Sequence, residues 1–164
     1  MLQYDFKKSV GYWSNVTSQA FQRALNEEVR PLGITWRQCQ VLAWLALEGR
    51  LSQAELAERM GIEPPTLVGI LDRMERDGWI QRESCPGDRR KKIVVATAEA
   101  EPIWDEIATC ARRVRQRATR GLTPEQVESL VAMLDLVQQN LNAPVEKQGS
   151  TADNENQPVA EKVH

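Results

Sequence analysis

Two short helical stretches separated by a tight turn that begins with a glycine constrain the fold of this chain more than any other feature. The stretches cover residues 52–60 and 64–76, with Gly61 between them. Relative positions 1, 5, 9, 15 and 18 of this segment are occupied by Gln53, Ala57, Gly61, Leu67 and Ile70. A small residue lets two helices cross closely, glycine permits a tight turn, and the aliphatic residues seat the second helix on a core. The spacing predicts a helix-turn-helix, although a helical bundle with one short loop has a similar pattern.

Helix start signals divide much of the remaining chain. In a capping box, a Ser or Thr hydroxyl and a Glu or Gln three residues later satisfy the free backbone donors at a helix start. The sequence predicts such boxes at Thr35, Ser52 and Thr123. Apolar residues at intervals of three and four predict a further amphipathic helix over about 6–30, which Pro31 ends.

A basic hairpin is predicted directly after the helix-turn-helix. Two β-favouring stretches, 79–83 and 92–96, flank a cluster of turn-forming residues. Residues 82–92 hold five cations against two acids, a local excess of +3, although the formal net charge of the chain is −2. The local excess decides contact with a polyanion more than the total charge does. After the hairpin, Thr97 is predicted to cap a long helix that ends near Gly121.

Composition and cysteine spacing exclude several classes of protein. Cys39, Cys85 and Cys110 lack metal-site spacing, and the single histidine, His164, is the last residue. We therefore expect no metal, no cofactor and no catalytic site; Cys39 and Cys110 are expected in the core, and Cys85 beside the basic hairpin is a candidate reactive thiol. No apolar stretch approaches the ~20 residues of a membrane span and no signal peptide is recognisable, so a cytoplasmic protein is expected. Residues 143–164 are polar and are predicted to be disordered.

The predicted elements have the order of a winged helix-turn-helix, which binds double-stranded DNA. In that fold the second helix enters the major groove and the hairpin, or wing, reaches the adjacent minor groove. The candidate DNA-binding residues are Ser52, Gln53, Pro65, Thr66, Val68, Gly69, Arg73, Arg82, Asp88, Arg89, Arg90, Lys91 and Lys92. An aspartate among cations can hold a neighbouring arginine in place by a charge-assisted hydrogen bond, which is the role expected for Asp88.

These residues resemble the MarR family of transcription regulators and, within it, the SlyA-like branch. The resemblance extends from about Lys7 to Leu141 and is densest at 61–68, 77–82 and 88–90. The family's D-x-R wing motif matches Asp88 and Arg90. The resemblance implies that the aspartate orients the wing and that the arginine enters the minor groove.

The resemblance also implies a homodimer on a near-palindromic operator, with the sign of regulation left open. It predicts a mainly α fold with a small β-hairpin wing, as one domain over 1–142. Its parts are a helix-turn-helix over about 52–76, a wing over about 79–96, and dimerisation helices over about 6–30 and 98–142. A winged-helix protein-interaction module without DNA binding is the alternative for the whole chain.

Proteins of this family often bind small aromatic acids or phenols between the dimerisation helices and the DNA-binding lobe, and release DNA when they do. By resemblance, such an effector is expected here. The candidate ligand-binding residues are Tyr12, Trp13, Trp36, Arg37 and Gln40. Ordinary core packing of these aromatic side chains is the alternative.

Overall fold

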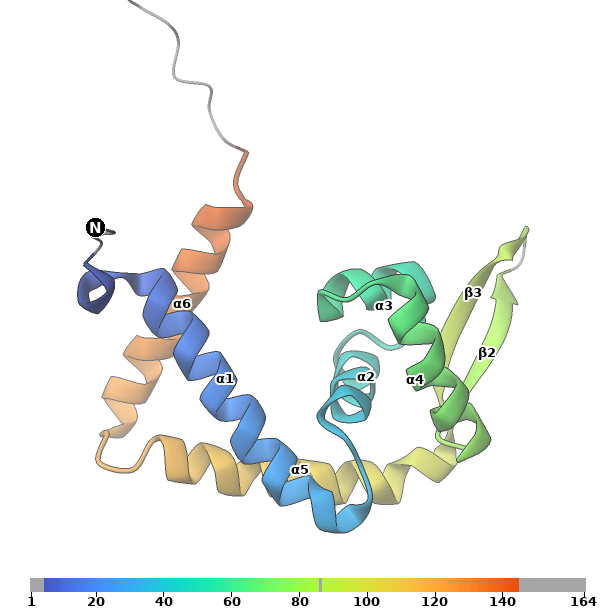
Figure 1. Ribbon diagram of the computed structural model, residues 1–164, viewed down its shortest axis with the longest axis horizontal. Coiled ribbons are helices and arrows are strands. Elements are labelled where there is room, and N and C mark those ends of the chain that lie inside the picture. The colour runs from blue at the N-terminus through green and yellow to red at the C-terminus, as the bar shows by residue number, and fades with distance from the viewer. Residues whose placement is uncertain (1–4, 86, 145–164) are drawn as a thin grey trace, which may run out of the picture. The chain divides into compact units, whose positions relative to one another are not determined.

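The computed structural model describes residues 5–85 and 87–144, without the side chains of Arg89 and Arg90. It is mainly helical with one small antiparallel sheet (Figure 1). The described elements are α1 (Val10–Val29), α2 (Trp36–Glu48), β1 (Leu51–Ser52), α3 (Gln53–Met60), α4 (Pro64–Arg76), β2 (Ile80–Cys85), β3 (Asp88–Ala96), α5 (Glu101–Ala118) and α6 (Pro124–Asn142). Short 3-10 turns lie at Phe6–Lys8, Arg30–Leu32 and Ala98–Ala100. The predicted fold class is therefore confirmed.

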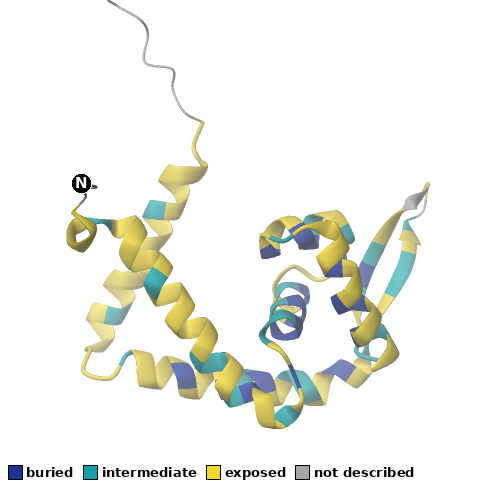
Figure 2. Cartoon of the chain, viewed as in Figure 1, coloured by how far each residue is buried: buried dark blue, intermediate teal, exposed yellow. Residues whose placement is uncertain are grey.

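The chain divides into two compact units, and the boundary in the sequence falls between Arg120 and Gly121. The first unit contains α1 to α5 and the sheet, and in its described part buried side chains of α2, α3, α4 and α5 form a hydrophobic core (Figure 2). Large fully buried residues of this core are Val41, Leu56, Leu67, Leu71, Met74 and Ile80. Because apolar burial is the main stabilising contribution to folding, this core fixes both helices of the helix-turn-helix to α2 and α5.

The predicted helix-turn-helix is confirmed by α3 and α4. Gly61 ends α3 with φ 58° and ψ 40°, a left-handed conformation that glycine adopts without steric cost. Pro64 occupies the first position of α4, where the missing N–H would have no partner in any case. The turn places Leu67 and Ile70 in the core and leaves the opposite flank of α4 to solvent.

The wing belongs to a three-stranded sheet with strand order β1-β3-β2. β2 pairs antiparallel with β3, with an irregular register between Ser84 and Cys85. On the other edge, β1 pairs with β3, so that Leu51 lies opposite Val94. The sequence did not predict β1, because a strand of two residues is too short to show alternation. This strand joins the start of α3 to the base of the wing.

Most helix starts agree with the sequence. The predicted capping boxes at Thr35, Ser52 and Thr123 are all confirmed. The first helix begins at Val10 rather than at Phe6, because the Ser9 hydroxyl accepts the backbone N–H of Tyr12 at 3.2 Å. This N-cap makes residues 6–8 a separate 3-10 turn.

The prediction that Thr97 caps the long helix is wrong. That helix, α5, begins at Glu101 after a 3-10 turn, and the Thr97 side chain makes no cap hydrogen bond. Its hydroxyl donates instead to the carbonyl of Gly78 at 2.6 Å, and its N–H donates to the carbonyl of Trp79 at 3.1 Å. A hydroxyl that donates one bond can still accept another, so it is the 3-10 turn Ala98–Ala100 that separates Thr97 from the start of α5. The bond to Gly78 joins the end of β3 to the end of α4.

The second unit contains one described element, α6. This helix has no buried residue, and its apolar side chains are exposed, Val131 at 61% and Leu141 at 80% (Figure 2). None of the described helices is long and apolar enough to cross a membrane. The predicted disorder of residues 143–164 falls, from residue 145 onward, outside the described residues.

Candidate nucleic-acid interface

The N-terminal half of α4 presents one exposed flank. Pro65, Thr66, Val68 and Gly69 are all exposed, whereas the apolar residues between and after them are buried. A Cβ placed on Gly69 would meet no atom within 4 Å, so the backbone there is open to close approach by another molecule. Arg73, one turn further along, is exposed as well. The flank is therefore small, weakly polar and accessible, as the sequence predicted.

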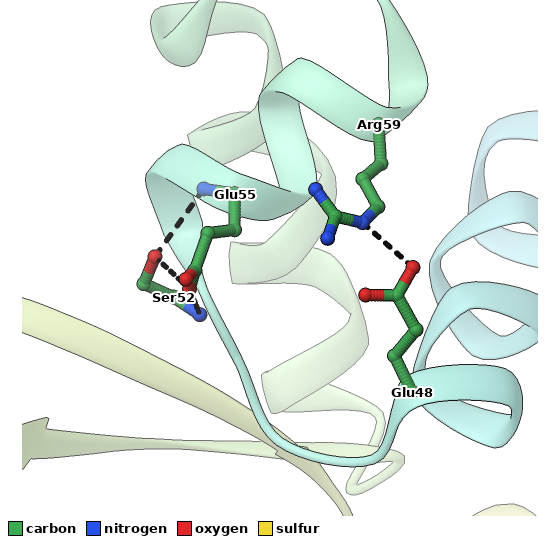
Figure 3. Close-up of polar contacts among 4 residues, drawn as sticks. All are labelled: Glu48, Ser52, Glu55 and Arg59. Atoms are coloured by element: carbon green, nitrogen blue, oxygen red, sulfur yellow. Dashed lines mark hydrogen bonds and ion pairs between the residues drawn. The ribbon is translucent and has the colours of Figure 1, made fainter. Parts of the chain in front are cut away.

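The start of α3 is held by its own polar contacts (Figure 3). The Ser52 hydroxyl accepts the N–H of Glu55 at 3.2 Å, and the Glu55 carboxylate accepts the N–H of Ser52 at 2.8 Å. Arg59 Nε donates to Glu48 Oε1 at 2.6 Å and ties α3 to the end of α2. Ser52 is 2% exposed, so its side chain serves the cap. Its half-buried neighbour Gln53 presents more surface.

Arg82, on β2, is clamped between two carboxylates of α4. Its Nη1 lies 2.7 Å from Asp72 Oδ1, its Nε donates to Glu75 Oε2 at 2.9 Å, and its backbone N–H donates to Glu75 Oε1 at 3.0 Å. The hydrogen bond from the Arg82 side chain is the main cause that lowers the pKa of Glu75, and the same bond raises the pKa of the guanidinium. Such charge-assisted bonds fix geometry as well as energy. Arg82 therefore joins the wing base to α4.

A second ion pair holds the wing from its other side. Arg50, just before β1, contacts the carboxylate of Glu83 on β2. Lys91 of β3 is exposed and lies close enough to the start of α3 to act on Glu55: its positive charge lowers the pKa of that carboxyl, after the larger effect of the hydrogen bonds from Ser52. The base of the wing is thus connected to both helices of the helix-turn-helix.

The wing tip carries the remaining predicted residues. Asp88 and Lys92 are exposed, and the Lys92 ammonium donates to the Ser84 hydroxyl at 2.9 Å. The predicted bond from Asp88 to a wing arginine involves the side chains of Arg89 and Arg90, which lie outside the described residues. That assignment stays a prediction.

The predicted ligand-binding residues do not line one common hollow. Trp36 and Arg37 line a hollow of about 390 Å³ between α1 and α2. Trp36 also lines, with Gln40, a second one of about 480 Å³ among α1, α2 and α5. Trp13 lines a third, of about 460 Å³, between α1 and α5. Tyr12 packs edge-on against Trp13 with 5.4 Å between ring centroids.

Sequence reasoning missed four residues that these sites use. Asp72 and Glu75, which bind Arg82, are three apart on a predicted helix and so share a face. Arg112 and Arg115 of α5 have the same spacing and line the hollow of about 480 Å³. In both cases the spacing was visible, but only tertiary contacts show what the shared face meets.

Cys39 and Cys110 lie in the core, as the sequence predicted, and the reactivity expected of Cys85 stays a prediction. Cys39 and Cys110 are each 2% exposed, and burial raises the pKa of the Cys39 thiol to about 12. Cys85 is half-buried. In the described part of the chain, no group of three or more His, Cys, Asp or Glu side chains is arranged to hold a metal ion.

This chain is similar to known proteins both in sequence and in structure. The sequence profile of the MarR family matches residues 32–91, from the turn before α2 into the wing. Wild-type apo MarR from E. coli is 28% identical, with a TM-score of 0.71 over 79% of this chain and 96% of that chain. A cysteine-to-serine mutant of E. coli MarR, solved with operator DNA, is 28% identical, with a TM-score of 0.67 over 78% and 92%. A MarR-family regulator from Rhodococcus sp. RHA1 shares the fold at 23% identity, with a TM-score of 0.74 over 82% and 96%.

Proposed function

We propose that this chain, which has the fold of the MarR-family transcription regulators, is a sequence-specific regulator that binds double-stranded DNA as a homodimer on a near-palindromic operator. The observation that carries the proposal is the exposed flank of α4 beside a basic wing, with Arg82 clamped between them. A 28% identical MarR has been solved with operator DNA, which supports the proposal. The proposal includes that the chain is a member of the SlyA-like branch.

Each part of this surface has its own role in the proposed complex. The residues of α4 that meet the major groove are Pro65, Thr66, Val68 and Gly69, with Gln53 and Arg73 on nearby phosphates. The wing residues that meet the minor groove are Arg89, Arg90, Lys91 and Lys92, with Asp88 orienting an arginine. Ser52 and Arg82 serve the interface by holding α3 and the wing in place.

DNA binding is tested first by selecting genomic fragments with the purified protein and measuring affinity for the selected operator. We expect log affinity to fall with log salt by roughly 0.9 per phosphate contact. Arg90→Ala is expected to weaken operator binding roughly tenfold to a hundredfold, because one base-reading arginine is worth about 1–3 kcal/mol. Arg120→Ala, an exposed arginine at the end of the first unit, is the matched control.

Two outcomes would contradict the proposal. Wild-type affinity in Arg90→Ala would discredit the role of the wing. Absence of duplex binding at every salt concentration would instead favour a winged helix that docks another protein.

The homodimer is proposed because both ends of the chain expose large apolar side chains. On α6 these are Leu130, Val131, Met133, Leu134, Leu136 and Leu141, and on α1 they are Val10, Trp13 and Phe21. Apolar surface of this extent is characteristic of an interface. Two-fold pairing would also place two recognition helices about one DNA turn apart, roughly 34 Å.

The dimer is tested by sedimentation of full-length variants. Val131→Asp, which places a charge on the apolar surface of α6, is expected to shift the protein towards a monomer. Gln139→Asp adds the same charge at an exposed position on the face of α6 opposite Leu134 and is expected to leave the dimer intact. Equal behaviour of the two variants would argue against an α6 interface.

A small aromatic acid or phenol is proposed as the effector, and the hollow of about 480 Å³ is its proposed site. Trp36 and Trp104 supply apolar surface there, while Arg112 and Arg115 can pair with a carboxylate. Salicylate added to the operator complex is expected to release DNA, and Arg115→Gln is expected to require more of it. Operator affinity that stays unchanged up to millimolar salicylate would remove the effector from the proposal.

A further inference from the structure

The polar hollow between α1 and α2, which Trp36 and Arg37 line, is separate from the hollow proposed for the effector. It has a volume of about 390 Å³, and one helical face of α1 together with the start of α2 forms its wall. Its lining includes two guanidinium groups, from Arg23 and Arg37, and three carboxamides, from Gln19, Gln22 and Asn26. No carboxylate is among the residues that line it. The hollow therefore combines positive charge with neutral hydrogen-bond donors.

Neither arginine of this hollow has an acidic partner in the described part of the chain. Arg37 Nη1 donates to Gln40 Oε1 at 2.9 Å and to the carbonyl of Met60 at 3.5 Å, both of which are neutral acceptors. Arg23 is exposed, and no carboxylate of the described residues forms an ion pair with it. Five other arginines of the described residues do bind carboxylates, namely Arg50, Arg59, Arg76, Arg82 and Arg113. Two like charges beside one hollow repel each other, and an anion between them would relieve that repulsion.

We propose that this hollow binds a phosphate oxyanion, held jointly by Arg23 and Arg37. Guanidinium groups present paired N–H donors that match phosphate oxygens, and the amide groups of Gln19 and Gln22 supply further donors at the same wall. The phosphate has two sources: the backbone of the DNA duplex, in which case the inference rests on the proposed function, or a free phosphate compound. The chemistry that recognises it is the same in both cases.

The position of Arg37 connects this site to the helix-turn-helix. Met60, whose carbonyl accepts the longer of its two hydrogen bonds, is the last residue of α3 and directly precedes the Gly61 turn. A phosphate that redirects the Arg37 guanidinium acts on the contact between α2 and the end of α3. Occupancy of the hollow is therefore coupled to the segment that positions α4.

The first arm of the test measures binding to a duplex of random sequence. The double variant Arg23→Gln/Arg37→Gln is compared with Arg30→Gln/Arg120→Gln, which removes the same two charges from exposed arginines outside the hollow. If the phosphate belongs to DNA, the slope of log affinity against log salt becomes shallower by roughly 0.9 for each lost contact, up to about 1.8. The control is expected to keep a slope near that of the wild type.

The second arm measures binding of inorganic pyrophosphate by calorimetry without DNA. If the source is a free phosphate compound, the wild type and the control bind it, and Arg23→Gln/Arg37→Gln loses at least about tenfold in affinity, because two charge-assisted contacts are removed. The single variant Arg23→Gln, whose side chain is exposed, serves if the Arg37 substitution disturbs folding.

The two arms together decide the inference. A change confined to the salt slope assigns the site to DNA, and a change confined to pyrophosphate assigns it to a free compound. Equal salt slopes combined with equal pyrophosphate binding in the two double variants would overturn it. If the wild type binds no duplex at all, the proposed function fails, while the pyrophosphate arm still tests the site.

Discussion

Replacing Arg82 with glutamine removes the cation that joins the wing to α4, and its cost follows from the contacts observed. Arg82 Nη1 lies 2.7 Å from Asp72 Oδ1, and its Nε lies 2.9 Å from Glu75 Oε2. The Arg82 side chain is 22% exposed. A hydrogen bond to a charged group contributes about 1.5–3 kcal/mol when shielded, and an exposed ion pair contributes about 0.2–1 kcal/mol. The carboxylates are 55% and 37% exposed, so each contact falls between these limits. We expect Arg82→Gln to lower the free energy of unfolding by about 2 kcal/mol.

Urea denaturation of the variant measures this loss, and a double-mutant cycle assigns it. Arg82→Gln, Glu75→Gln and the double variant are compared with the wild type, and we expect a coupling free energy of about 1 kcal/mol between Arg82 and Glu75. In thermal unfolding, a loss of about 2 kcal/mol corresponds to a fall in Tm of roughly 4–8 °C for a chain of this size. A coupling below about 0.3 kcal/mol would mean that the two residues act independently, which would refute the clamp.

The same variants separate positioning from direct contact with DNA. If Arg82 positions the wing, Arg82→Gln and Glu75→Gln both weaken operator binding, and neither changes the salt slope by a full contact. If Arg82 instead binds a phosphate, Arg82→Gln alone makes the slope shallower by roughly 0.9. That second result would refute the positioning role while leaving the proposed function intact.

Three further predictions concern the stability and reactivity of single residues. The Arg82 hydrogen bond lowers the pKa of Glu75 from its ordinary value of 4.5, so the stability it contributes is present above that value and is lost as pH falls through the lower folded pKa. In urea titrations between about pH 6 and pH 3, the wild type should therefore lose more stability than Glu75→Gln; parallel losses would contradict this. Gly61→Ala should destabilise the protein by about 1–2 kcal/mol because φ is 58° there, whereas Gly69→Ala, in a helix with no atom within 4 Å of the new Cβ, should stabilise it by up to about 1 kcal/mol; a Tm that rises for Gly61→Ala, or falls for Gly69→Ala, would contradict the prediction for that variant. Because burial raises the pKa of Cys39 to about 12, iodoacetamide at about pH 8 should alkylate the half-buried Cys85 first; mass spectra showing native Cys39 modified as fast would refute this.

The elements that could be predicted from the sequence are those whose signals are local. A capping box depends on two residues three positions apart, so the boxes at Thr35, Ser52 and Thr123 were visible without any tertiary information. The glycine turn and the exposed flank of α4 follow in the same way from helical periodicity. Thr97 had the right residue type for a cap, but its hydroxyl found a carbonyl 19 positions away in the chain. The start of α5 is instead delayed to Glu101 by the 3-10 turn after Thr97, and the residue type alone does not show such a turn.

The predicted ligand-binding residues lie near opposite ends of a long helix, so local sequence patterns could not show whether they share one site. Trp13 lies in the first turn of α1, whereas the backbone N–H of Trp36 donates to the side chain of Asn26, near the other end of that helix, at 3.3 Å. At about 1.5 Å per residue, the stretch of α1 from Trp13 to Asn26 is roughly 20 Å long. A single small molecule cannot contact both indoles within one chain. The aromatic residues of the predicted ligand-binding set are similar in type, but they lie in different parts of the fold.

The wing is held by contacts between residues that are far apart in the sequence, which sequence patterns do not show. The position of a substitution in the wing, at its base or at its tip, therefore decides its effect. Its base is held by long-range contacts that include the pairing of Leu51 with Val94, the clamp on Arg82, and the bond from Thr97 to Gly78. Its tip, around Asp88, carries exposed charge. Changes at the base remove packing and hydrogen bonds, so they must lower stability and DNA affinity together. Replacing an exposed lysine near the tip, such as Lys91, removes mainly charge, so it should lower affinity with little effect on stability.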